Sequence, residues 1–93
     1  MEKLNIDGIE FTGYSIPTAS ANILLINAAR GFLGCGYFSV ETADRLGEIV
    51  AIVSGVKNYD DMLNATVKKV SAAAAEAGIT PGITGREALK MMR

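Results

Sequence analysis

The chain contains no histidine, and this absence excludes more chemistry than any other feature of its 93 residues. Histidine is the most common general base and metal ligand in proteins, and it supplies the base in Ser-His and Cys-His pairs. A zinc site with Cys and His ligands is essentially excluded, because the chain also has only one cysteine. Catalysis would have to use Cys, Lys, Asp, Glu or Tyr, and we expect neither a bound metal nor a cofactor.

Disulfides and long apolar segments are missing as well. A single cysteine cannot form an internal disulfide, which is typical of a reducing compartment. The N-terminal segment lacks the apolar core of a signal peptide. The longest apolar runs, Ile49 to Val53 and Ala72 to Ala75, are too short to cross a bilayer. We therefore expect a cytoplasmic protein with no membrane partner.

Excess charge of one sign is also absent. Nine Lys and Arg oppose ten Asp and Glu, which gives a net charge of -1 at pH 7. Nucleic-acid binding requires a dense positive field along one face of the protein. Here the basic residues are scattered, apart from Lys68-Lys69, so we do not expect nucleic acid as a partner.

Apolar residues, in contrast, are abundant. They make up 49% of the chain, whereas charged residues make up 20%. A chain of this length is one domain, and it buries roughly two-thirds of the surface that its unfolded form exposes. We expect part of the remaining apolar surface to lie at an interface with further copies of the chain, in a dimer or a higher oligomer. The alternative is a monomer with an unusually apolar surface.

The first part of the sequence alternates apolar and polar residues as β-strands do. Asp7-Gly8 between such residues is the strongest short signal for a hairpin with a type I′ turn. Pro17 should end the second strand because it lacks a backbone donor. The segments Asn22 to Ala28 and Phe32 to Phe38 predict two more strands, joined by a tight reversal at 29–31. We expect an antiparallel sheet of about four strands in two hairpins.

From Ser39 onward the apolar residues follow helical spacing. Ser39 predicts the N-cap of a first helix that ends at Gly55. A second helix is predicted over 58–78, and β-branched residues within 65–70 leave a strand there as the alternative. Thr84-Gly85-Arg86-Glu87 matches a capping box at the start of a short terminal helix. The sequence therefore predicts a single α+β domain over residues 1–93, with two to three helices packed on one face of the sheet.

The predicted fourth strand carries glycine at two alternate positions, Gly34 and Gly36. Glycine weakens a strand interior, so this pattern indicates the close approach of another backbone or of a ligand. The two glycines leave a stripe without side chains on one face of the strand. Either a helix or a second subunit packs on this glycine stripe, or the stripe forms a groove for a flat ligand. Cys35, which lies between the two glycines, is either a buried structural residue or a reactive thiol activated by Arg30, Arg86 or a lysine.

The segment Gly82-Ile83-Thr84-Gly85-Arg86 places glycines, a hydroxyl and an arginine at a helix start. Free backbone N–H groups and the helix dipole attract anions there, and the guanidinium of Arg86 can bind an anion through bidentate hydrogen bonds. The alternative is a capped helix whose arginine pairs with a nearby acid. The candidate ligand-binding residues are Arg30, Gly34, Gly36, Thr84, Gly85 and Arg86, and the candidate catalytic residue is Cys35.

Three stretches together carry a family resemblance: Arg30-Gly31 with Cys35-Gly36-Tyr37, the segment Asp60 to Asn64, and the segment Gly82 to Leu89. In these stretches the chain is similar to the YunC-like domains of unknown function, which are small proteins of bacteria and archaea. The resemblance implies an α+β fold and carries no known activity, substrate or catalytic residue.

These observations favour a non-catalytic, oligomeric binding module with a small anionic ligand near Arg86, Thr84 and the glycine stripe. Two alternatives remain open. One is an enzyme that uses Cys35 as a reactive thiol, and the other is a protein–protein adaptor.

Overall fold

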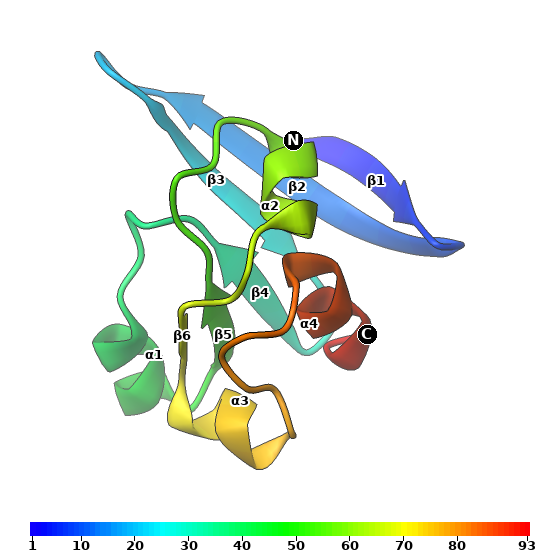
Figure 1. The fold of residues 1–93 in the computed structure, drawn as a ribbon, viewed down its shortest axis with the longest axis vertical. Helices are drawn as coiled ribbons and strands as arrows, with labels where there is room; N and C mark the ends of the chain where they lie inside the picture. Colours follow the sequence, from blue (N-terminus) through cyan, green and yellow to red (C-terminus); the bar gives the residue numbers. More distant parts are fainter.

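The computed structural model describes all 93 residues and contains a six-stranded mixed sheet and four short helices (Figure 1). In sheet order, the strands are β1 (Glu2–Ile6), β2 (Ile9–Pro17), β3 (Asn22–Asn27), β4 (Gly31–Gly34), β5 (Ile49–Ile52) and β6 (Lys69–Val70). The helices are α1 (Val40–Leu46), α2 (Tyr59–Asn64), α3 (Ala72–Glu76) and α4 (Gly85–Met91). None of the helices has the length and apolar content needed to cross a membrane.

The four N-terminal strands form two antiparallel hairpins, which confirms that part of the sequence prediction. Asp7 and Gly8 have φ values of 53° and 84°, the positive values that a type I′ turn requires. Pro17 ends β2, as expected for a residue without a backbone donor. The α+β fold is therefore built on the predicted hairpins.

The first predicted helix (39–55) is wrong beyond Leu46. Ser39 caps its N-terminus as predicted, but Gly47 adopts a left-handed φ of 72° and ends the helix. The following run from Ile49 to Val53 forms β5 and its continuation, and β5 pairs in parallel with β4. A continuous, mostly β-branched run suits a strand that is buried on both faces. This strand pairing overrides the helical spacing of the same residues.

The second predicted helix (58–78) is wrong in its centre. Asn58 caps α2 as predicted, but the helix ends at Asn64, and β6 pairs with β5 before α3 begins. The strand alternative is correct for Lys69–Val70. The terminal helix α4 starts with its predicted capping box at Thr84.

Ser71 connects β6 to α3 and fixes both to the start of β5. Its side chain is fully buried. The Oγ atom accepts hydrogen bonds from the backbone N–H groups of Val50 at 3.0 Å and Ala74 at 3.2 Å, and it donates to the carbonyl of Glu48 at 2.7 Å. One hydroxyl therefore serves as the N-cap of α3 and as a bond to the sheet.

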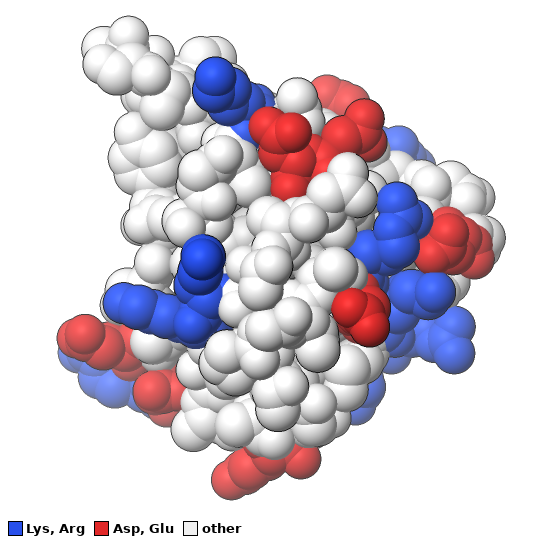
Figure 2. All heavy atoms as spheres, in the orientation of Figure 1, with Lys and Arg blue, Asp and Glu red and all other residues white.

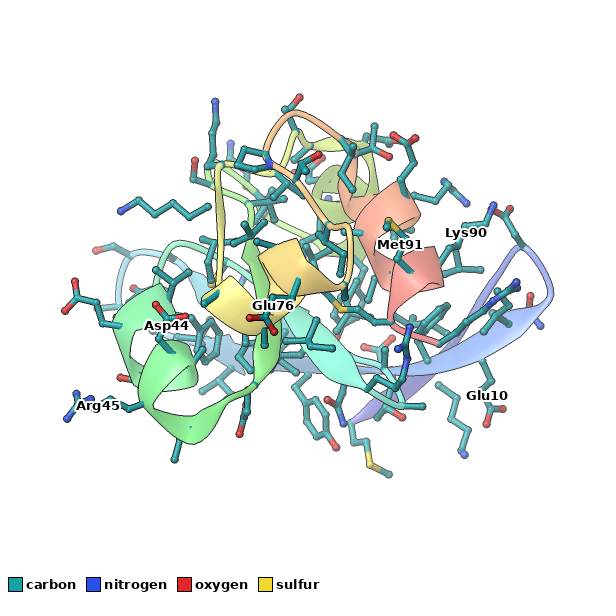
Figure 3. All side chains as sticks on the ribbon, turned by 90° about the horizontal axis from the view of Figure 1, so that it is seen from below. Glu10, Asp44, Arg45, Glu76, Lys90 and Met91 are labelled. Atoms are coloured by element: carbon teal, nitrogen blue, oxygen red, sulfur yellow. The ribbon has the colours of Figure 1, made fainter.

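The helices lie on both faces of the sheet, which corrects the expectation of helices on one face. α2, α3 and α4 cover the face that holds the main core, and Figure 3 shows them above the strands in an edge-on view. α1 lies on the opposite face, where Ala43 packs on Val50 and Ile52. It covers only β4 and β5, so the same face of β2 and β3 has no helix over it.

Candidate functional site

Arg30 binds the C-terminal end of α4. Its Nε donates to the carbonyl of Arg93 at 3.2 Å, a second guanidinium nitrogen donates to Met91, and its backbone N–H donates to Met92 at 2.9 Å. The last carbonyls of a helix have no partners within the helix, and an arginine is a favourable partner for them. Two of the three guanidinium nitrogens of Arg30 and its backbone N–H are therefore occupied within the chain.

Arg86 pairs with Asp7 in the turn between β1 and β2. Its guanidinium lies 3.2 Å from one carboxylate oxygen, and the ammonium of Lys90 lies 3.1 Å from the other. The hydrogen bond from Lys90, with the charges of Lys90 and Arg86, holds the pKa of the Asp7 carboxyl below its ordinary value. The structure thus has the arrangement of a helix whose arginine pairs with a nearby acid.

Thr84 is occupied by the capping box of α4. Its Oγ1 accepts the N–H of Glu87 at 3.2 Å, and the Glu87 carboxylate accepts the Thr84 backbone N–H at 3.0 Å. This backbone bond, together with the bond from the Thr84 hydroxyl, lowers the pKa of the Glu87 carboxyl. Both side chains therefore stabilise the helix start.

Gly34 and Gly85 lie tightly against other parts of the chain. A Cβ atom on Gly34 would come within 2.8 Å of the Phe38 ring, and one on Gly85 would overlap the carbonyl oxygen of Met62. Neither residue lines a hollow in the surface. Both glycines allow close packing. For Gly34, close packing is one of the two explanations considered from the sequence, although Phe38 rather than a helix or a second subunit packs on it.

Gly36 lies beyond the end of β4, because the predicted strand (32–38) stops at Gly34 and a turn follows. It lines a hollow of about 330 Å³ at the carboxyl ends of β4 and β5. A second hollow of about 400 Å³ adjoins it, and the two share four lining residues. We call this pair the strand-end hollow, and its lining residues are Ser20, Ala21, Asn22, Cys35, Gly36, Tyr37, Gly55, Val56 and Lys57.

The strand-end hollow occupies a favourable position in the fold. Figure 1 shows the arrowheads of β4 and β5 pointing the same way, as their parallel pairing requires. Ligands of α/β proteins commonly bind outside the carboxyl ends of parallel strands. Of the six candidate ligand-binding residues, Gly36 alone lines the hollow, and Arg30, Thr84 and Arg86 line none.

Cys35 is the buried member of this lining. Its backbone N–H donates to the carbonyl of Leu24 at 3.0 Å, and its Sγ accepts the N–H of the same residue at 3.3 Å. No charged side chain lines the part of about 330 Å³ that contains Cys35, Lys57 lines only the adjoining part, and Arg30 and Arg86 are engaged elsewhere. These contacts are those of a structural residue.

A second surface of interest is the uncovered face of β2 and β3. Cross-strand pairing of Tyr14 with Leu25 and of Ile16 with Ile23 places all four side chains on this face. Tyr14 is 38% exposed and Ile16 is 58% exposed. With Phe38, these side chains line a shallow hollow of about 390 Å³.

This apolar surface continues over α1. Phe38 also lines a neighbouring hollow of about 370 Å³, together with Tyr37 and Leu46, which are 56% and 67% exposed. We call the whole surface the open face, and its residues are Tyr14, Ile16, Ile23, Leu25, Tyr37, Phe38 and Leu46.

The sequence holds a signal for the open face that our sequence analysis missed. No charged residue occurs between Glu10 and Arg30, a stretch that contains most of β2 and all of β3. The far ends of these two strands form an arm that projects beyond the helices in Figure 1, and Figure 2 shows this arm without Lys, Arg, Asp or Glu. So long an uncharged stretch at the surface is unusual for a strand pair that faces only water.

Comparisons with known proteins agree with this fold. A family model described as a domain of unknown function (DUF1805) matches residues 34–92. The uncharacterized protein YunC of Bacillus subtilis (strain 168) is 32% identical over an alignment of 93 residues, gaps included. The alignment covers 95% of this chain and 92% of that protein. The crystal structure of a protein of unknown function, TA1206 from Thermoplasma acidophilum, superposes with a TM-score of 0.93 at 33% identity and covers 99% of this chain and 90% of that one. The YunC-like resemblance is thus confirmed, and the chain belongs to the DUF1805 family of domains of unknown function.

Proposed function

We propose that this chain is a non-catalytic binding module that acts as a homo-oligomer, with the open face as its interface. One observation carries the proposal. The large apolar side chains that are exposed are Met1, Tyr14, Ile16, Tyr37 and Leu46, and all of them except Met1 belong to the open face. Monomeric proteins rarely expose a contiguous apolar patch larger than a few hundred Å².

The absence of charge on the part of the open face over β2 and β3 supports a second copy of the chain as the occupant. None of the residues that line its hollow over β2 and β3 is Asp, Glu, Lys or Arg, and Glu48 is the one charged residue that lines the neighbouring hollow over α1. Two identical faces can therefore meet around a two-fold axis without like-charge repulsion and without burying an ion. A stable interface buries about 800 Å² on each partner, so the interface would include the projecting arm as well as the residues named above.

The backbone of the arm offers a further contact. β1 pairs with β2 only as far as Gly13, so the edge of β2 from Tyr14 to Pro17 has no strand beside it on that side. An uncovered strand edge presents unpaired N–H and C=O groups to another chain. Main-chain hydrogen bonds at this edge would set the register of the two copies, while the apolar side chains supply the affinity.

A charge placed on the part of the open face that lies on the arm tests the proposal. Ile16→Asp introduces an unpaired carboxylate at the interface, and we expect it to lower the mass of the folded protein in sedimentation velocity. Thr80→Asp is the matched control, since it adds the same charge at an exposed position outside the open face. We expect this control to sediment as the wild type does.

The outcomes separate the proposal from the adaptor alternative. Equal masses for wild type and Ile16→Asp, with circular dichroism showing both folded, would overturn the proposed interface. A wild-type chain that is itself monomeric would favour the adaptor alternative, in which the open face receives a different protein.

A further inference from the structure

We propose that the strand-end hollow binds a small organic anion, a compact molecule that carries a phosphate or carboxylate group on an apolar body. The inference rests on the binding role in the proposed function and names the site and the class of ligand. It does not depend on self-association. The argument uses the loops that follow β4 and β5.

Backbone donors in these two loops are free to bind an oxyanion. The N–H groups of Gly36 and Tyr37 after β4, and of Gly55 and Val56 after β5, donate no hydrogen bond within the chain. Successive backbone N–H groups in turns form concave sites for anions, and Gly55 has the left-handed φ, 70°, that occurs in such turns. Two pairs of consecutive donors therefore border one hollow.

The charge of the lining favours an anion over a cation. Lys57 is its single charged residue, and no Asp or Glu lines either part of the hollow. The ammonium of Lys57 takes part in none of the three ion pairs of the chain. The nearby Asp61 carboxylate accepts the backbone N–H of Lys57 at 3.0 Å. The side chains of Asn22 and Ser20 add neutral hydrogen-bonding groups to the lining.

The shape and the remaining lining favour a compact apolar body. The side chains of Ala21, Cys35 and Val56 and the ring of Tyr37 supply apolar contact. The Tyr37 hydroxyl lies 3.3 Å from Thr18 Oγ1, which ties the ring to the turn between β2 and β3. Hollows of about 330 and 400 Å³ lie within the range of roughly 300–1,000 Å³ that small-molecule sites occupy.

Gly36 leaves the backbone accessible to such a ligand. A Cβ atom placed on it would find no atom closer than 3.9 Å, in contrast to the crowded Gly34. A glycine with open space where a side chain would lie is typical of sites where a ligand approaches the backbone closely. The groove that the sequence suggested along the glycine stripe is therefore placed at Gly36.

Titration of the ¹⁵N-labelled full chain with phenyl phosphate, benzoate and inorganic phosphate tests the inference, with benzamide as the uncharged control. We expect saturable shifts of the amide signals of Gly36, Tyr37, Gly55 and Val56 with the two organic anions. Benzamide should leave these signals in place. Inorganic phosphate should bind more weakly than phenyl phosphate, because it lacks the apolar body.

Three variants sharpen the result. Lys57→Ala should weaken phenyl phosphate binding about tenfold, since it removes a charge-assisted hydrogen bond. Lys68→Ala, which removes an exposed lysine outside the hollow, should bind as the wild type does. Gly36→Leu should abolish the shifts by adding a side chain to the lining.

Several outcomes would overturn the inference. They are the absence of saturable shifts with either organic anion, shifts confined to Thr84–Arg86, and unchanged affinity in Lys57→Ala. Equal affinity for inorganic and phenyl phosphate would overturn the apolar part of the ligand. The Ile16→Asp variant separates this failure from that of the proposed oligomer, because it should keep the anion site while it loses the interface.

Discussion

At the scale of single residues, Ser71 is the most sensitive polar position in the fold. Replacing it with alanine leaves the buried N–H of Val50 and the carbonyl of Glu48 without their partner, and it removes the N-cap of α3. We expect Ser71→Ala to lower the free energy of unfolding by about 2–3 kcal/mol in urea at a fixed protein concentration. Ser20→Ala, at an exposed position, is the control. A loss in Ser71→Ala no larger than in the control would contradict the assigned bonds.

Asp7 is one of two carboxyl residues, with Glu87, at which acid should act on the fold. Lys90 and Arg86 lower the pKa of the Asp7 carboxyl in the folded protein. The ionised carboxylate therefore stabilises the fold fully at pH values above the ordinary carboxyl pKa. This stabilisation is lost as the pH falls through the lowered pKa. NMR titration of the carboxyl signal should therefore give a higher pKa in Lys90→Ala than in the wild type. Asp7→Asn, which suits the positive φ of this turn, should show a smaller loss of stability on acidification. An unchanged Asp7 pKa in Lys90→Ala would contradict the ion pairs.

At the scale of elements, the docking of α4 depends on one glycine. Gly85→Ala would place a methyl group against the Met62 carbonyl and within 2.8 Å of a Leu33 methyl carbon, so α4 would have to move away from α2 and β4. We expect a loss of about 1–3 kcal/mol in the free energy of unfolding, although alanine is the better helix former. Gly36→Ala is the matched control and should change stability by less than about 0.5 kcal/mol. Similar stabilities for the two variants would refute this packing.

The elements also show which parts of the fold the sequence can predict. The first hairpin, the Ser39 and Asn58 caps and the capping box at Thr84 depend on residues close in the chain, and all were predicted. The run from Ile49 to Val53 fits both a helix and a buried strand, because helical spacing and a continuous apolar run coincide there. The choice is made by pairing with β4, a contact distant in sequence that local periodicity does not contain.

β6 is a second element for which local spacing does not decide between helix and strand. Two residues, Lys69 and Val70, form the strand, and the hydroxyl of the following Ser71 both caps α3 and bonds to the start of β5. The β-branched residues near this point indicated a strand as an alternative to a helix. The sequence signal was therefore present, and the tertiary bonds decided between the two.

At the scale of the whole molecule, the strand-end hollow draws its lining from three separate segments. Gly36 and Cys35 were candidates from the sequence because of the unusual glycine spacing. Asn22, Val56 and Lys57 carry no local signal, and they meet only because β4 and β5 run parallel and end beside the turn between β2 and β3. The parallel pairing was missed, so the hollow was missed with it.

The central claim about the whole molecule is that the apolar open face joins copies of the chain. Light scattering from the unmodified chain, over a range from micromolar to millimolar concentration, tests it most directly. The account predicts a mass that is a multiple of 9.8 kDa at the upper concentrations and that falls on dilution if the interface is weak. A mass of one chain at every concentration would contradict it.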